Sequence, residues 1–70
     1  MSKSLVGKFF IKAEGAYKEY KGNKAFDAGN YIKAKNAYQE LYVLYKYELG
    51  EKHPDTLDAL EALAISYECL

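Results

Sequence analysis

The stretch that decides the fold is residues 22–42, GNKAFDAGNYIKAKNAYQELY. Two helical patterns meet in it at one short break. The pair Gly29-Asn30 predicts the end of a helix, because glycine and asparagine tolerate the left-handed backbone conformation that ends many helices. After the break, apolar and aromatic residues recur at spacings of three and four, which is one stripe of a 3.6-residue helix. The stripe consists of Tyr31, Ala34, Tyr38, Leu41 and Tyr45.

Small residues stand on both sides of this break. Gly22, Ala34 and Ala37 have little side-chain bulk. Two antiparallel helices can therefore approach each other closely at these positions, with Tyr31 and Tyr38 filling the space beside them. The pattern predicts a tight helix pair of the kind that stacks against further helices.

Two long helices follow from this pattern. The first is expected over residues 3–28, with a bend possible at Gly15, and the second from Tyr31 to about Leu49, ending at Gly50. One glycine costs only about 1 kcal/mol inside a helix, so Gly15 need not end the first one. An apolar stripe is expected along the first helix and contains Leu5, Val6, Phe9, Phe10, Ala13, Ala16, Tyr17 and Tyr20.

A third helix is expected over residues 55–69. Pro54 fits the first helical position, where its missing N–H costs nothing. Either His53 or Asp55 would then cap the helix. The residues expected to be buried are Leu57, Leu60, Leu63, Ala64 and Tyr67. The predicted fold class is all-α: an antiparallel helical hairpin plus a third helix, forming a single domain over residues 1–70.

Composition narrows the class of protein. Half of the 70 residues are hydrophobic and 29% are charged, which is typical of a globular chain. No apolar run approaches the roughly 20 residues that span a bilayer. With one cysteine there is no disulfide framework, so a cytoplasmic location is expected.

Charge is unevenly distributed along the chain. Residues 1–35 contain eight lysines and three carboxylates, a net of +5, whereas residues 36–70 contain two lysines and seven carboxylates, a net of −5. All ten positive charges are lysine. Because bidentate recognition of guanine or phosphate relies on arginine, the sequence argues against sequence-specific nucleic-acid binding.

Residues with catalytic or metal-binding chemistry are few. The only histidine, His53, stands beside a proline in a connector, and the only cysteine, Cys69, is next to last. Neither has a partner that would make a metal site or an activated nucleophile. The expectation is a protein that is not an enzyme and that has no catalytic residues, no metal site and no cofactor.

The set Gly22, Gly29, Tyr31, Ala34 and Tyr38 resembles a tetratricopeptide (TPR) repeat. Further on, Leu49-Gly50-Glu51-Lys52-His53-Pro54-Asp55-Thr56-Leu57, followed by Leu63-Ala64 and Tyr67, is similar to the longer-period variant found in kinesin light chains. The resemblance covers roughly residues 15–70. It implies an α-solenoid fragment whose function is protein–protein interaction.

A self-comparison at an offset of 42 residues agrees with this resemblance. The offset relates Gly22 to Ala64 and Ala25 to Tyr67. Residues 15–49 would then form the first repeat, and residues 55–70 the first helix of a second. The chain would hold about one and a half repeats. Residues 1–14 do not match at this offset and are expected to be an N-terminal helical extension or cap.

The resemblance also implies a groove lined by the first helix of each repeat. The corresponding positions are Ala16, Glu19, Asn23, Phe26 and Asp27 in the first repeat, and Asp58, Glu61, Ile65, Glu68 and Cys69 in the second. Asn23 matches an asparagine with which some TPR proteins hold a peptide. Glu19 stands where a carboxylate-binding lysine would be, which argues against an acidic C-terminal tail as the ligand. The groove positions include five carboxylates and no lysine, so a basic or lysine-rich peptide is the expected ligand. The alternative, that these acids are a solvated helix face, remains open.

Two other hypotheses belong to different functional classes. The third helix would leave an apolar stripe uncovered, so the chain could be a self-assembling unit, expected as a homodimer. The interface would be formed by Leu57, Leu60, Leu63 and Tyr67. The last-ranked hypothesis is binding of a membrane surface or of nucleic acid, without sequence preference, through the basic N-terminal helix.

Overall fold

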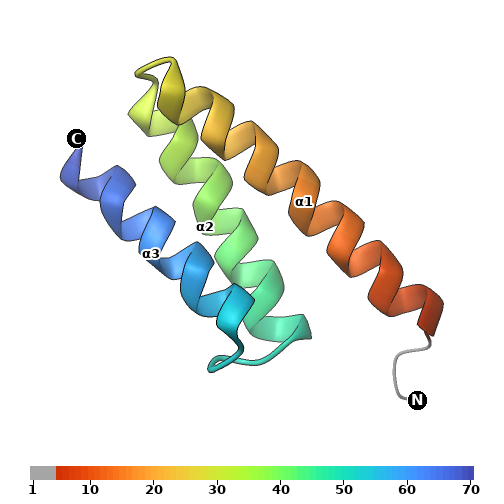
Figure 1. Ribbon diagram of the computed structural model, residues 1–70. Helices are drawn as coiled ribbons and strands as arrows, with labels where there is room; N and C mark the ends of the chain where they lie inside the picture. The colour runs from red at the N-terminus through yellow and green to blue at the C-terminus, as the bar shows by residue number, and fades with distance from the viewer. Residues whose placement is uncertain (1–4) are drawn as a thin grey trace.

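Three α-helices make up the computed structural model, which describes residues 5–70, with side chains from residue 11 onward. They are α1 (Leu5–Asp27), α2 (Tyr31–Glu48) and α3 (Pro54–Glu68). Successive helices run antiparallel, and α2 lies between α1 and α3 and packs against both (Figure 1). The described residues contain no strand. The all-α prediction is therefore confirmed.

The break between α1 and α2 falls where the sequence places it. Gly29 has a φ of 79°, the left-handed conformation that ends a helix at little cost for glycine. The Asn30 N–H then donates to the Ala25 carbonyl at 2.9 Å. The Asn30 side chain begins α2, because its Oδ1 accepts from the Lys33 N–H at 3.1 Å. One dipeptide thus ends one helix and begins the next.

The second connection is built in the same manner. Gly50 has a φ of 103°, and its N–H donates to the Tyr45 carbonyl at 3.1 Å. Pro54 is the first residue of α3. The His53 Nδ1 accepts from the Asp55 N–H at 3.1 Å, so of the two candidate caps it is His53 that caps the helix.

Glycines on α1 allow α2 to come close. A Cβ at Gly22 would lie 2.5 Å from Cε1 of Tyr38, a separation that folded proteins do not tolerate. Gly15 makes the same kind of close contact with the ring of Tyr45. The helix continues through Gly15, so this glycine serves as a contact for a tyrosine on α2. The prediction of small-into-large packing is confirmed at Gly22, and Ala34 is fully buried.

The core forms where α2 meets its two neighbours. Its buried residues are Ala25, Ala34, Tyr38, Leu41 and Ala59, with Phe26, Tyr42, Tyr45, Ala62 and Leu63 packed against them. Two fully buried polar residues belong to α3. Thr56 Oγ1 donates to the Gly50 carbonyl at 2.7 Å, and Ser66 Oγ donates to the Ala62 carbonyl at 3.0 Å. Because both hydroxyls are paired, their burial leaves no unsatisfied donor.

The face of α3 that packs on α2 differs from the prediction. The buried residues are Thr56, Ala59 and Ser66, and only Leu63 of the predicted set is partly buried. The prediction was wrong for four residues that are exposed: Leu57, Leu60, Ala64 and Tyr67. Small side chains allow closer helix approach than leucines do, and the paired hydroxyls make this polar face suitable for burial.

The predicted apolar stripe of α1 was also wrong. Ala13, Ala16, Tyr17 and Tyr20 are exposed, whereas the buried residues are Ile11, Gly15, Gly22 and Ala25. The glycine-bearing face packs against α2 because it admits the tyrosine rings of that helix. The stripe's first four side chains, Leu5, Val6, Phe9 and Phe10, lie outside the described side chains. None of the helices in the described region has the length and apolar character needed to cross a membrane.

Candidate binding groove

A groove lies over α2 between α1 and α3. It begins in a hollow of about 170 Å³ to which all three helices contribute. The walls come from α1 and α3, which flank α2 on either side (Figure 1). The lining residues are Glu19 and Asn23 of α1, Tyr38, Leu41 and Tyr45 of α2, and Asp55, Asp58, Ala59 and Ala62 of α3.

The charge of this hollow is of one sign. Glu19 from one wall and Asp55 and Asp58 from the other are carboxylates, and no lysine is among the described residues that line it. Asp55 also stands in the first turn of α3, at the positive end of its dipole. Carboxylates on two facing helices make the hollow attractive to a cation.

The floor of the hollow carries two tyrosine hydroxyls. Burial raises the pKa of Tyr38, and the charges of Asp27 and Glu19 raise it further. Burial likewise raises the pKa of Tyr45, with added contributions from Asp55 and Glu19. Carboxylates of both walls therefore act on the tyrosines of the floor, and the same negative charge would stabilise a cation bound there.

A hydrogen bond orients the single amide in the hollow. The Tyr38 hydroxyl donates to Oδ1 of Asn23. With its carbonyl oxygen engaged in this way, Asn23 presents its NH2 group as a donor. A peptide carbonyl is the acceptor that matches this donor. The amide thus adds a neutral contact beside the three carboxylates.

An apolar hollow adjoins the acidic one. It has a volume of about 160 Å³ and is lined by Phe26, Tyr38, Ala62 and Ile65. Tyr38 and Ala62 also line the acidic hollow, so the two hollows are neighbours along the groove. The ring of Phe26 is held edge-on to Tyr31, with the centroids 5.1 Å apart. The groove therefore offers an acidic end and an apolar end.

Five of the ten groove positions named from the sequence line the two hollows. Glu19, Asn23 and Asp58 line the acidic one, and Phe26 and Ile65 line the apolar one. The other five are exposed and line neither: Ala16, Asp27, Glu61, Glu68 and Cys69. Lining residues not named from the sequence are Tyr38, Leu41, Tyr45, Asp55, Ala59 and Ala62. The floor residues belong to the tyrosine stripe that the sequence predicts for α2, whereas Asp55 was considered from the sequence only as a helix cap.

A second exposed surface lies along α3. Leu57 is 51% exposed, Leu60 42% and Tyr67 53%, while Leu63 is partly buried against the core. At the 42-residue offset, the exposed residues Leu57, Ala64 and Tyr67 correspond to Gly15, Gly22 and Ala25. Those three α1 residues form the face that packs on α2. The exposed stripe of α3 thus occupies the positions that, on α1, pack against a neighbouring helix.

Within the described region, no group of three histidine, cysteine or carboxylate side chains is arranged to hold a metal ion. Comparison of the chain with protein-family models, with curated proteins and with solved structures finds no match.

Proposed function

We propose that this chain is a TPR-type protein–protein interaction module that binds a lysine-bearing peptide in the groove between α1 and α3, without catalysis. The observation that carries the proposal is the acidic hollow, in which Glu19 of one helix faces Asp55 and Asp58 of another over a tyrosine floor. The proposed location is cytoplasmic, and the free, exposed thiol of Cys69 supports it.

The helix arrangement supports the TPR assignment. The helix pair, its Gly29 turn and the His53-capped third helix occur in the order that the sequence resemblance requires. The groove lies between the first helix of the proposed repeat and the first helix of the next, where the family binds peptides. The proposal thus rests on a sequence pattern and on a hollow found independently of it.

Recognition would use both ends of the groove. A lysine ammonium enters the acidic hollow, where charge-assisted hydrogen bonds to carboxylates are the strong ones. The NH2 group of Asn23 holds a carbonyl of the peptide backbone. A neighbouring apolar side chain of the peptide fills the hollow between Phe26 and Ile65. The preferred ligand therefore carries a lysine followed or preceded by an aliphatic residue.

Calorimetric titration with two peptides tests this proposal. One peptide contains lysine and leucine, and in the other glutamate replaces lysine. The lysine peptide is expected to bind more tightly, and the double variant Glu19→Gln/Asp58→Asn to lose most of that preference. The matched control is Glu61→Gln/Glu68→Gln, which removes the same charge outside the groove. Equal binding of both peptides, or an equal loss in both variants, would contradict the proposal.

A second candidate function is self-association through α3. The exposed fractions of Leu57, Leu60 and Tyr67 favour it, because such a stripe gains by burial against another surface. Most soluble homo-oligomers close with two-fold symmetry. A homodimer that pairs α3 with α3 of a second copy would leave the groove open, so the two functions are compatible.

A further inference from the structure

A second furrow runs between α1 and α2, on the flank of their contact that faces away from the groove. Its end near the α1–α2 turn has a volume of about 360 Å³. The lining residues there are Tyr17, Tyr20, Lys21, Lys24, Ala25, Ala28, Asn30 and Lys33. The furrow continues along the two helices into a hollow of about 180 Å³ that shares Tyr17, Lys21 and Lys33 with it.

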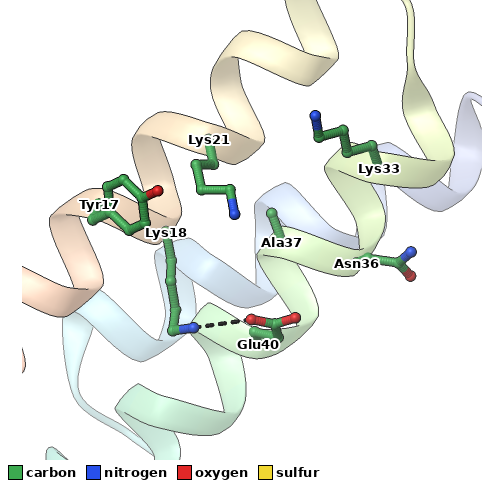
Figure 2. A pocket seen from close by; sticks show the side chains of 7 residues that line it. All are labelled: Tyr17, Lys18, Lys21, Lys33, Asn36, Ala37 and Glu40. Carbon is green, nitrogen blue, oxygen red and sulfur yellow. Dashed lines mark hydrogen bonds and ion pairs between the residues drawn. The ribbon is translucent and has the colours of Figure 1, made fainter.

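The charge of this furrow is opposite to that of the groove. Of the described residues that line its turn end, three are lysines and none is a carboxylate. Figure 2 shows Lys21 from α1 and Lys33 from α2 extending into the space between the helices, beside Ala37. The furrow therefore gathers positive charge from two helices, and an anion placed there would relieve the repulsion among the lysines.

An ion pair marks where the basic part of the furrow ends. Lys18 Nζ lies 2.9 Å from Oε1 of Glu40 (Figure 2). This hydrogen bond lowers the pKa of the Glu40 carboxyl, and the charges of Lys18 and Lys21 lower it further. Because Lys18 and Glu40 neutralise each other, the net charge of the furrow comes from Lys21, Lys24 and Lys33.

Two tyrosine rings stand beside these lysines. Tyr17 is 62% exposed and Tyr20 is 59% exposed, and they lie three residues apart on α1. The ammonium groups of Lys21 and Lys24 lie 5.4 Å and 5.8 Å from the centroids of these rings. Exposed aromatic rings that alternate with lysines are the arrangement on which single-stranded nucleic acids bind, with bases stacked on the rings.

The corresponding face of α3 shows that this composition is not needed for packing. At the 42-residue offset, the furrow residues Tyr17, Tyr20, Lys21 and Lys24 correspond to Ala59, Ala62, Leu63 and Ser66. The α3 set is small or apolar and packs on α2. A face that is merely solvated needs neither exposed aromatic rings nor charges of a single sign. The α1 set has both.

We propose that this furrow binds single-stranded nucleic acid, with phosphates on Lys21, Lys24 and Lys33 and bases stacked on Tyr17 and Tyr20. The furrow extends through two adjoining hollows along the helices, a shape that suits a strand better than a single small molecule. Binding is tolerant of sequence, because the chain has no arginine for bidentate base readout. The site is separate from the peptide groove and does not depend on it.

Fluorescence anisotropy with a short labelled oligothymidylate tests the proposal. Binding at low salt is expected, with a slope of log K against log salt of about −2, since three lysines each release counterion from a single strand. The triple variant Lys21→Gln/Lys24→Gln/Lys33→Gln should abolish binding. The matched control Lys35→Gln/Lys46→Gln/Lys52→Gln removes the same charge elsewhere and should retain it. Circular dichroism of each variant verifies the fold.

Single substitutions test the stacking. Tyr17→Leu and Tyr20→Leu should each weaken binding about fivefold or more, whereas Tyr47→Leu, which alters an exposed tyrosine outside the furrow, should not. Several results would overturn the proposal: no binding at low salt, equal loss in both triple variants, or tyrosine substitutions without effect. Equal affinity for polyglutamate would assign the furrow to acidic peptides, and equal affinity for thymidine monophosphate would assign it to a free nucleotide.

Discussion

Gly22 of α1 lies directly against the ring of Tyr38 of α2, so that a Cβ at this glycine would meet Cε1 of the tyrosine at 2.5 Å. Tyr38 is only 4% exposed, and its hydroxyl is bonded to Asn23 one residue further along α1. Together with the contact of Gly15 and Tyr45, the contact of Gly22 and Tyr38 brings the two helices close to each other, and Tyr38 lines both hollows of the groove. Helix packing and the shape of the groove therefore depend on the same pair of residues.

Replacing Gly22 with alanine tests this contact. Alanine gains about 1 kcal/mol in helix propensity, but overpacking typically costs about 1–3 kcal/mol. Because the ring is buried and hydrogen-bonded, we expect a net destabilisation of about 1 kcal/mol in urea unfolding. In a Tyr38→Leu background the same Gly22→Ala change should become stabilising. A Gly22→Ala protein more stable than the parent would show that the ring is free to move.

Ala34 provides a second test of close packing. It is fully buried in the core cluster of α2 and its neighbours, so Ala34→Leu should cost about 1–3 kcal/mol. Ala16→Leu is the control, because Ala16 is exposed on α1. Thermal unfolding followed by circular dichroism gives both values. If the two variants melted within a degree of each other, Ala34 would not face a neighbouring helix.

Ionisation of a partly buried tyrosine is expected to unfold the protein at alkaline pH. The pKa of Tyr45 is raised above its ordinary value of 10.0, mainly by burial. The neutral phenol thus stabilises the fold fully below pH 10, and this stability is lost as pH rises through the raised pKa. Tyr45→Phe should move the alkaline unfolding midpoint upward, and Tyr47→Phe, at an 83% exposed residue, should not. If neither substitution changed the midpoint, ionisation of Tyr45 would not contribute to alkaline unfolding.

Self-association should depend on the exposed stripe of α3. Burying a large apolar side chain contributes about 1.5–3 kcal/mol when burial is complete, so two leucines and a tyrosine per chain can hold a weak dimer. Sedimentation equilibrium should show concentration-dependent association that Leu60→Glu abolishes. Ile32→Glu, at an exposed residue of α2, is the control. A monomer of 8.0 kDa at all concentrations would refute the dimer.

Helix boundaries could be predicted because single residues determine them. Gly29, Asn30, Gly50 and Pro54 each restrict the backbone or supply a cap, and such local effects can be read from sequence alone. The stripe of α2 was also predictable, because α2 contacts a helix on both sides and two of its three buried residues, Tyr38 and Leu41, are large.

The buried faces of α1 and α3 could not be predicted in the same manner. On both helices the side that packs on α2 carries small residues, such as Gly22 and Ala59, while large apolar residues such as Tyr17 and Leu57 are exposed. Hydrophobic periodicity follows side-chain size and therefore selected the wrong side. The basic furrow was missed for the same reason, because it requires knowing that Tyr17 faces outward beside lysines of two helices.

We propose that the acidic groove holds a lysine side chain of the bound peptide. The most direct test is a two-dimensional NMR titration of the isotopically labelled protein with a lysine- and leucine-containing peptide. We expect shift changes to concentrate at Glu19, Asn23 and Asp58, with the outer edge of α3 at Leu57 and Leu60 unchanged. Changes confined to that outer edge, or no change at saturating peptide, would contradict the account.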